Sequence, residues 1–404
     1  MEKEVDYEKL CCERLLAWQQ GKTPGPLHVT IFPTFRCNLN CAICNRHWNK
    51  DTRITGTEFA TERMLRLVDE SVEIGTKYWM IGGGGEPMVR RDAVMDLCRR
   101  IKHHKMAGSL QTNGTLLTPE SIEELVSLGW EEVSISIDGW TADMSDRLRF
   151  GGAFEKSKEA VRQFAAAKKR LGCPYPDVRV ACVLSRFNSD SLCEMVEKVR
   201  EMGANALVFI QMIVYADGMA ELTPTPEQLS RLRPQFEAAR TLGNRLGIVT
   251  SLAALPPGEQ PAARVRWQGK SPYSRALCIE PWLNLVVLSS GRCAPCCVFG
   301  NGMTDSLYEK SLKEIWLGQA MQRIRQQVME GPAPEDCTNH CQAQYTDRRA
   351  RILMFLDPGD MFSLNPWHLG KKALSSLRRN GIKVSYARGM QWLELRKKRG
   401  KTCP

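Results

Sequence analysis

The chain contains the run Arg36-Cys-Asn-Leu-Asn-Cys-Ala-Ile-Cys44, in which Cys37, Cys41 and Cys44 have the spacing C-x3-C-x2-C. The run directly follows the apolar, strand-like segment 28–33. Cysteine thiolates are the usual protein ligands of [4Fe–4S] clusters, and three of them can bind three irons of one cube. The fourth iron then has no local protein ligand, so a small molecule can bind it. The spacing therefore predicts a catalytic iron–sulfur site rather than a structural one.

Zinc is the alternative metal for these cysteines. A structural zinc site is closed by four ligands, and His47 could supply the fourth. The softness of three thiolates suits either metal. The motifs further along the chain favour the cluster.

Three more motifs follow, each at the end of an apolar run. They are Gly82-Gly-Gly-Gly-Glu-Pro87, Gln111-Thr-Asn-Gly114 and Ser134-Ile-Ser-Ile-Asp138-Gly139. A single glycine run is weak evidence, but these motifs occur in a fixed order after the cysteine triplet. Together the four motifs resemble those of the radical S-adenosylmethionine (radical SAM) superfamily.

This resemblance implies a cofactor pair and a chemistry. A [4Fe–4S] cluster on Cys37, Cys41 and Cys44 would bind S-adenosyl-L-methionine (SAM) at its open iron. Reductive cleavage of SAM gives a 5′-deoxyadenosyl radical, which abstracts hydrogen from an unactivated C–H. The protein supplies binding, orientation and exclusion of water. A reductant such as flavodoxin or ferredoxin is the expected electron donor.

The resemblance also assigns SAM contacts, residue by residue. The expected contacts are Gly83, Gly84, Gly85, Glu86, Thr112, Asn113, Ser136, Asp138, Ile43 and Ser185. The glycines and Glu86 are expected beside the methionine ammonium group, because glycine lets a backbone approach a ligand closely. Ser136 and Asp138 are expected to bind the ribose or the carboxylate. Ile43 stands where the family often has an aromatic residue near the adenine, and an aliphatic side chain can also cover that ring.

The order of elements predicts an α/β fold. Strand-like runs at 28–34, 78–82, 108–112, 132–138, 177–185 and 206–213 alternate with helical patterns. Alternating strands and helices favour a parallel sheet with helices outside. The resemblance makes this a partial (β/α)6 TIM-like barrel. In such sheets ligands bind at the carboxyl ends of the strands, where every motif lies.

Composition is that of an ordinary folded protein. Of the 404 residues, 43% are hydrophobic and 25% charged, which is usual for a globular chain. The N-terminus is charged and lacks the apolar core of a signal peptide, and no apolar run approaches the ~20 residues of a membrane span. The 16 cysteines are therefore interpreted as cluster ligands and reduced thiols in a cytoplasmic protein.

A second group of cysteines occupies 278–341. It comprises Cys278, Cys293, Cys296, Cys297, Cys337 and Cys341, around a predicted hairpin and a helix. The pattern resembles the SPASM/twitch extension of radical SAM enzymes, which holds auxiliary iron–sulfur clusters. The resemblance assigns Cys278, Cys296, Cys337 and Cys341 to one auxiliary [4Fe–4S] cluster and leaves Cys293 and Cys297 as spares. A zinc-ribbon-like structural site is the alternative.

The remaining segments complete a five-part organisation. The predicted parts are an N-terminal helical segment (1–24), the radical SAM barrel (25–215), a helical linker (216–270), the auxiliary iron–sulfur domain (271–350) and a basic amphipathic tail (351–404). Residues 367–404 contain eleven Lys or Arg and one acid, so they account for +10 of the net charge of +11. A basic segment with interleaved Trp and Leu is typical of membrane-surface binding. A solvated helix packed on the barrel, or contact with an acidic peptide or nucleic acid, remains open.

Three classes of function fit the motifs. The first is oxidation, epimerisation or coupling of a small, sugar-linked or lipid-linked metabolite, with the basic tail in peripheral contact with an anionic membrane. The alternative is modification of a ribosomally made peptide; only about 25 residues precede the first strand, which leaves little room for a peptide-recognition domain. The third is electron transfer without SAM cleavage, which the GGGGEP motif and the open iron disfavour.

Overall fold

The computed structural model describes residues 2–48, 58–252, 273, 276, 278–297, 304–330 and 352. Its strands form one sheet in the order β7-β6-β5-β4-β3-β2-β1-β8-β9. Their bounds are β1 (His28–Ile31), β2 (Tyr78–Ile81), β3 (Ala107–Thr112), β4 (Glu132–Ser136), β5 (Asp177–Leu184), β6 (Ala206–Gln211), β7 (Val249–Leu252), β8 (Asn284–Val287) and β9 (Cys293–Ala294).

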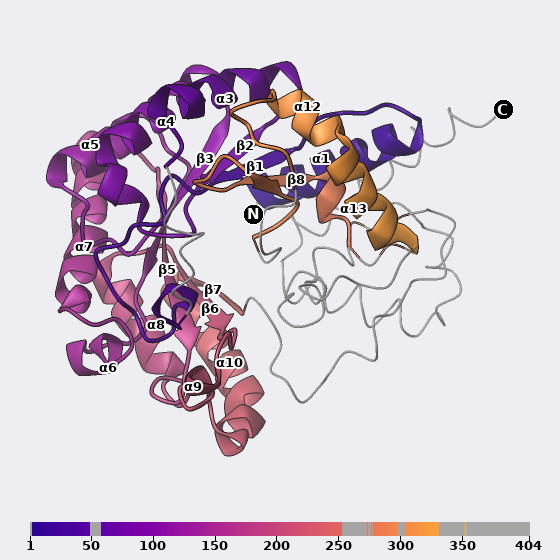
Figure 1. The fold of residues 1–404 in the computed structure, drawn as a ribbon. Helices are drawn as coiled ribbons and strands as arrows, with labels where there is room; N and C mark the ends of the chain where they lie inside the picture. The colour runs from indigo at the N-terminus through magenta and orange to yellow at the C-terminus, as the bar shows by residue number, and fades with distance from the viewer. Residues whose placement is uncertain are drawn as a thin grey trace.

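Helices follow the strands and cover the outside of the sheet (Figure 1). Around the barrel they are α2 (Asn45–Trp48), α3 (Thr61–Glu73), η2 (Pro87–Arg90), α4 (Arg91–His103), α5 (Pro119–Ser127), α6 (Ala142–Asp146), α7 (Ala153–Leu171), α8 (Leu192–Met202), α9 (Asp217–Ala220) and α10 (Pro226–Leu246). The first and last parts of the described chain contribute α1 (Glu2–Gln19), η3 (Glu280–Trp282), α12 (Leu312–Leu317) and α13 (Gln319–Glu330). Among the helices of the described residues, none combines the length and the apolarity that a membrane crossing needs.

The six predicted strands are confirmed as β1 to β6, all parallel. Figure 1 shows α3, α4, α5, α7 and α8 as an arc around them, so the barrel is partial. Strand β1 ends at Ile31, three residues short of the prediction. Pro33 lies just beyond it, and proline has no N–H to donate to a sheet.

Two strands extend the sheet beyond the six that were predicted. Val249–Leu252 forms β7, parallel to β6, so the predicted helical linker over 216–270 is wrong for these residues. The predicted helix before it is confirmed as α10, and its left-handed cap at Gly247 turns the chain back toward the sheet. At the other edge β8 pairs in parallel with β1 and in antiparallel with β9. The predicted hairpin is therefore continuous with the barrel sheet.

The two faces of the strands differ in polarity. Side chains such as Leu110, Ile135 and Val180 alternate toward the helices and are fully buried. Their neighbours Gln111 and Ser136 point to the other face and remain partly exposed. A strand places successive side chains on opposite faces, so the inner face of the barrel is lined with polar groups, while the helices seal the outer face.

Residues 278–297 and 304–330, called the auxiliary half from here on, are held against α1 by aromatic contacts. The Arg325 guanidinium lies 4.7 Å from the Trp18 ring centroid and 4.4 Å from that of Trp316. The Trp316 indole also donates a hydrogen bond of 2.8 Å to the Pro24 carbonyl. Cation–π contacts gain strength when water is excluded. Thus α13, α12 and the segment before β1 form one packed unit.

Candidate functional site

The loop after β1 carries the three predicted cluster ligands. Cys41 is buried, and Cys37 and Cys44 are half-buried. The backbone turns tightly here: the Leu39 amide donates to the Cys37 sulfur over 3.4 Å, and the Cys44 amide donates to the Cys41 carbonyl over 3.1 Å. Burial raises the pKa of the Cys37 thiol and that of the Cys41 thiol to about 11. Both thiols therefore need a bound cation to become thiolates at neutral pH.

The three thiols interact without meeting at one point. The Cys44 and Cys37 thiols both add to the rise in the pKa of Cys41, so the three groups lie within electrostatic reach of one another. Within the part of the chain that the structure describes, no three Cys, His, Asp or Glu side chains are gathered closely enough to hold a single metal ion. A cube binds each thiolate at a separate iron, whereas zinc needs its ligands around one centre.

The glycine loop after β2 packs against the cysteine loop, which is a second reason for its glycines beside the predicted approach to a ligand. A Cβ on Gly85 would lie 2.0 Å from the Arg36 carbonyl oxygen, and one on Gly83 would lie 2.2 Å from the Phe32 ring. The close approach is therefore to the chain itself. The Gly83 and Gly84 carbonyl oxygens accept no hydrogen bond from the described residues. They remain available to an ammonium group.

Glu86 fastens the ends of β2 and β3 together. It is 2% exposed, and its Oε1 accepts hydrogen bonds from the Met88 amide at 3.0 Å and the Thr112 hydroxyl at 2.6 Å. Its Oε2 accepts from the Asn113 amide at 2.6 Å. Burial raises the pKa of Glu86, and these hydrogen bonds oppose the rise. The carboxylate thus organises the loop first, and one lone pair of Oε2 remains for a ligand.

Asn113 connects β3 to the cysteine loop. Its side-chain amide donates to Asn38 Oδ1 at 3.0 Å and lies 4.0 Å from the Cys37 sulfur. Asn38 in turn donates to the Thr115 hydroxyl at 2.7 Å. The structure therefore brings the predicted residue Asn113 beside the first cysteine, while Thr112 is hydrogen-bonded to Glu86. Asn113 thus helps to fix the cysteine loop in place.

Asp138 has contacts within the protein that the motifs did not predict. It is fully buried; its Oδ1 accepts from the Val183 amide at 2.7 Å, and its Oδ2 accepts a short hydrogen bond from Arg149 Nε. Both oxygens are thus occupied by the protein. Asp138 thus holds Arg149 in place and joins the end of β4 to β5, and its expected contact with the ribose stays a prediction.

Arg149 lies near the predicted site residues and belongs to none of the sequence motifs. Its positive charge opposes the rise in the pKa of both Cys41 and Glu86, so it lies at the centre of the site. The hydrogen bond to Asp138 uses Nε, and within the described residues the terminal nitrogens have no acceptor. A guanidinium pairs well with a carboxylate. The only sequence signal was a position eleven residues after Asp138.

Three predicted contacts remain to be placed. Ser136, at the end of β4, is partly exposed and makes no hydrogen bond to the described residues, so it is available to a ligand. Ile43 is partly exposed in the cysteine loop. Ser185 is fully buried, and its hydroxyl accepts from the Phe187 amide at 3.3 Å. This side chain closes the turn after β5, and its expected SAM contact stays a prediction.

Four cysteines of the second group fall within the described residues. Cys278 and Cys296 are half-buried, and the Glu280 amide donates to the Cys278 sulfur over 3.3 Å. Cys293 is fully buried in the core, where burial raises its pKa, and Cys297 is exposed. The other two predicted ligands, Cys337 and Cys341, lie outside the described residues, as does the basic segment 367–404.

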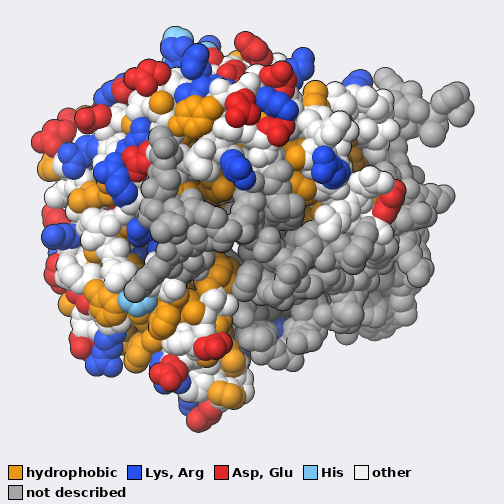
Figure 2. Space-filling view, in the orientation of Figure 1, with side chains coloured by type: hydrophobic (Ala, Val, Ile, Leu, Met, Phe, Trp, Pro, Cys, Tyr) orange, Lys and Arg blue, Asp and Glu red, His pale blue; other side chains and the backbone are white. Residues whose placement is uncertain are grey.

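Exposed apolar side chains surround the cysteine loop. Phe150 and Tyr215 are 45% and 40% exposed, and Trp48 is 37% exposed; the His47 ring lies 5.1 Å from Trp48 and 6.4 Å from Phe150. Figure 2 shows hydrophobic side chains gathered low on the visible face, over α6, α8 and α9. Burial, followed by the Cys297 and Cys44 thiols, raises the pKa of Tyr215 to about 12. This residue therefore lies within electrostatic reach of both cysteine groups.

Two family models match the chain. The radical SAM superfamily model matches residues 31–197, and the SPASM iron–sulfur cluster-binding domain matches residues 278–342. The second match begins at Cys278 and ends one residue after Cys341. The chain therefore contains a radical SAM domain followed by a C-terminal SPASM domain. The cofactors of this class are a [4Fe–4S] cluster, SAM and auxiliary iron–sulfur clusters.

Similar proteins fall in the same class. The chain is 28% identical over 352 residues to the PqqA peptide cyclase of Granulibacter bethesdensis, covering 84% of this chain and 86% of the relative. It is 31% identical over 194 residues to the AdoMet-dependent heme synthase of Methanosarcina barkeri, which spans only about half of each protein (48% and 49%). The crystal structure of Streptococcus suis SuiB bound to S-adenosylmethionine has a TM-score of 0.59 at 15% identity, covering 80% of this chain and 72% of that one. At that identity the likeness to SuiB concerns the fold alone.

The residues present fit this cofactor set. Three interacting thiols, the free carbonyls of Gly83 and Gly84, and the buried Arg149 provide ligands or partners for iron, an ammonium and a carboxylate. The charges also match, because Arg149 offsets the negative charge that three thiolates bring. The mouth of the barrel can therefore hold a cluster together with a zwitterionic amino-acid group.

Proposed function

We propose that this protein modifies a ribosomally made peptide by abstracting hydrogen from one of its unactivated C–H bonds. The observation that carries the proposal is the similarity to a peptide cyclase over 84% of the chain, through both the barrel and the SPASM domain. The sequence motifs alone favoured a small, sugar-linked or lipid-linked metabolite. Similarity along nearly the whole chain supports the peptide alternative more directly than the motifs support a metabolite.

Cys37, Cys41 and Cys44 would hold the cluster, which with SAM supplies a 5′-deoxyadenosyl radical when reduced by a donor such as flavodoxin or ferredoxin. The chain's own groups then orient SAM. The Gly83 and Gly84 carbonyl oxygens would accept hydrogen bonds from its ammonium, and Arg149 would bind its carboxylate.

Two further groups complete this arrangement. Ser136 would donate to a ribose hydroxyl, and Ile43 would cover one face of the adenine.

Cys278, Cys296, Cys337 and Cys341 are the proposed ligands of a single auxiliary [4Fe–4S] cluster. Cys293 is too deeply buried in the core to be a ligand without rearrangement.

The apolar rim supports a substrate with sizeable side chains. Trp48, Phe150 and Tyr215 are exposed around the opening where the cysteine loop lies. Aromatic side chains bury large areas in contacts and dominate recognition surfaces. A peptide can place an apolar residue against this rim and direct the reacting carbon inward.

A small-molecule substrate is the second candidate. The observation that favours it is the similarity of about half the chain to a heme synthase, at the highest identity of the relatives named above. The predicted anionic membrane contact through 367–404 belongs to this candidate, and those residues lie outside the described part of the chain.

The experiment is isotope tracing during co-expression. The protein is expressed with each short open reading frame encoded beside its gene, with peptides uniformly deuterated at carbon, and 5′-deoxyadenosine is analysed by mass spectrometry. The proposal predicts deuterium in 5′-deoxyadenosine and a changed peptide mass with the wild type, and neither with Cys41→Ala. Unchanged peptides, together with deuterium transfer from a labelled metabolite pool, would transfer the assignment to the second candidate.

A further inference from the structure

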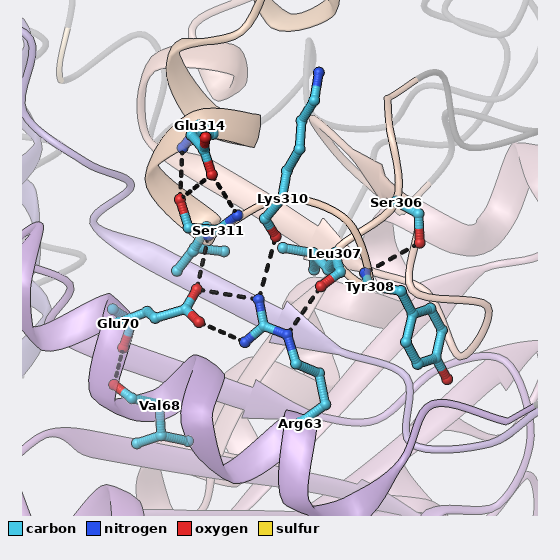
Figure 3. A network of polar contacts seen from close by, with 11 residues as sticks. Arg63, Val68, Glu70, Ser306, Leu307, Tyr308, Lys310, Ser311 and Glu314 are labelled. Atoms are coloured by element: carbon cyan, nitrogen blue, oxygen red, sulfur yellow. Dashed lines mark hydrogen bonds and ion pairs between the residues drawn. The ribbon is translucent and has the colours of Figure 1, made fainter.

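Helix α3 grips the auxiliary half of the chain through one buried arginine. Arg63 is 8% exposed, and its Nε donates to the Leu307 carbonyl at 2.8 Å. Its Nη2 donates to the Lys310 carbonyl at 3.2 Å, and its Nη1 to Glu70 Oε1 at 2.5 Å. Figure 3 shows the guanidinium directed at these partners from α3. The arginine thus binds two backbone carbonyls that lie more than 240 residues away in sequence.

Glu70, which is also on α3, links Arg63 to the start of α12. Its Oε2 accepts from the Leu312 amide at 2.7 Å, the first residue of α12. Ser311 caps that helix, with its hydroxyl accepting from the Glu314 amide at 3.3 Å. The charged side chains of Arg63 and Glu70 therefore hydrogen-bond the backbone of 307–312. Arg63 donates to two carbonyls, and Glu70 accepts from one amide (Figure 3). Hydrogen bonds to charged groups are stronger than neutral ones.

The residues just before α3 contact the loop of the catalytic cysteines. Glu58 accepts from Arg36 through Nε at 2.7 Å and Nη2 at 2.9 Å, and the Thr34 hydroxyl also donates to it. Arg36 immediately precedes Cys37. Glu58 is thus linked to Cys37, the first predicted cluster ligand, through its hydrogen bonds with the preceding residue, Arg36.

The same short segment contacts the hairpin of the SPASM domain. The Phe59 amide donates to the Ser289 carbonyl at 2.7 Å, at the turn between β8 and β9. The Phe59 ring meets Tyr308 edge to face with centroids 4.9 Å apart, and the Tyr308 hydroxyl donates to the Glu58 carbonyl at 3.2 Å. Residues 58–70 therefore contact the cysteine loop at one end and the auxiliary half along their length.

We propose that residues 58–70 form a bridge that fixes the position of the auxiliary cysteines relative to the Cys37–Cys44 loop, with Arg63 as its main positioning residue. Electron exchange between two metal centres, or between either centre and a substrate radical, falls steeply with distance. Small displacements at a reaction centre already cost large factors in rate. A bridge anchored by a buried, fully hydrogen-bonded arginine holds that distance constant. The inference depends on the two cysteine groups and not on which substrate is used.

The test compares variants of the bridge with a control on the same helix. Arg63→Ala removes the hydrogen bonds to the Leu307 and Lys310 carbonyls and to Glu70, and Arg63→Lys keeps the charge but loses the forked geometry. Tyr308→Phe removes only the hydrogen bond to Glu58. The control is Asp69→Asn, because Asp69 pairs with Arg100 and His104, and among the described residues it forms no hydrogen bond or ion pair with 304–317.

The first readout is hydrogen–deuterium exchange of the full-length protein. With Arg63→Ala we expect the amides of 312–317 to exchange about tenfold faster or more, since each charge-assisted bond lost is worth about one such factor. Strands β3 to β5 should be unchanged, and Arg63→Lys should lie between. Equal protection of 312–317 in Arg63→Ala and wild type would overturn the proposal, as would an equal effect of Asp69→Asn.

The second readout is specific to positioning. In the reconstituted, dithionite-reduced protein, the magnetic interaction between the two clusters is measured by electron paramagnetic resonance. We expect a weakened or broadened interaction in Arg63→Ala and, to a lesser degree, in Tyr308→Phe, with iron per chain unchanged. An unaltered interaction in both variants would contradict the bridge. If Arg63→Ala does not fold, Arg63→Lys and Tyr308→Phe carry the same test. Neither readout needs the substrate, so failure of the peptide proposal would leave this result interpretable.

Discussion

Arg149 shows how one buried charge organises the mouth of this barrel. It is held by Asp138, which also accepts from the Val183 amide, and it lies within electrostatic reach of Cys41 and Glu86. The sequence predicted Asp138 as a site residue from its place at the end of an apolar run. It could not reveal the partner, because pairing across β4 and a following loop leaves no periodic or motif signal.

Removing the partner of Arg149 should destabilise the fold. We expect Asp138→Ala to lower the free energy of unfolding by about 3–5 kcal/mol, because a buried charge is left uncompensated. The measurement is urea unfolding of the apo-protein. The matched control is Asp143→Ala, which breaks the exposed pair with Arg147 and should cost less than about 1 kcal/mol. Equal effects of the two substitutions would refute the structural role given to Asp138.

The cysteine loop makes the most direct prediction at the residue level. Cys41→Ala should abolish 5′-deoxyadenosine formation and reduce iron by about four atoms per chain, the content of one cube. Cys173→Ala, at a half-buried thiol beyond the end of α7, should change neither. Iron analysis and product chromatography after anaerobic reconstitution check both. SAM cleavage at wild-type rate by Cys41→Ala would rule out the assigned cluster.

Strands and helices could be predicted where a long apolar run or a helix cap marks the element in the sequence. All six strands from β1 to β6 and the helix α10 follow from runs of that kind and from caps such as Thr225-Pro226. Strand β7 was missed because Val249–Leu252 has two polar residues, Thr250 and Ser251, at its centre and so contains no apolar run. The pairing of β8 with β1 was missed because contacts between distant segments leave no local pattern.

The glycine loop is constrained by close packing against the cysteine loop, and its contact with SAM stays a prediction. We expect Gly85→Ala to displace the Arg36 backbone, since the added Cβ would lie 2.0 Å from its carbonyl oxygen. Cluster loading at the neighbouring cysteines should therefore fall, in addition to an overpacking cost of about 1–3 kcal/mol. The control Gly172→Ala has open space and a φ of +62°, so it should cost about 1–2 kcal/mol with full iron loading. An iron content per chain in Gly85→Ala equal to that of the wild type would show that the two loops are not coupled.

At the scale of the whole molecule, the two cysteine groups belong to one packed unit. The auxiliary half shares the barrel sheet through β8, packs on α1 through Arg325, and is gripped by Arg63. The sequence predicted the two halves as consecutive domains, and composition and spacing cannot show how tightly such halves join. The substrate class likewise came from similarity along the chain, because motifs that bind SAM carry no information about the molecule that is modified.

The two cysteine groups have different proposed roles, so we expect that SAM cleavage can be retained when product formation is lost. We expect Cys296→Ala to retain SAM cleavage, because the three catalytic cysteines are intact, and to lose formation of the modified peptide. The ratio of 5′-deoxyadenosine to product, measured by mass spectrometry, should rise at least tenfold; a factor of ten corresponds to about 1.4 kcal/mol in the barrier of the step lost. Full product formation would exclude Cys296 as a ligand of a required auxiliary cluster.

The most direct test of the central claim is anaerobic reconstitution with iron and sulfide, followed by iron counting and by assay of 5′-deoxyadenosine with dithionite and SAM. The account predicts about eight irons per chain, four in each of two cubes, and formation of 5′-deoxyadenosine. About four irons would contradict the auxiliary cluster, and about twelve would contradict a single one. A fully loaded protein that forms no 5′-deoxyadenosine, with or without peptide, would contradict the catalytic assignment itself.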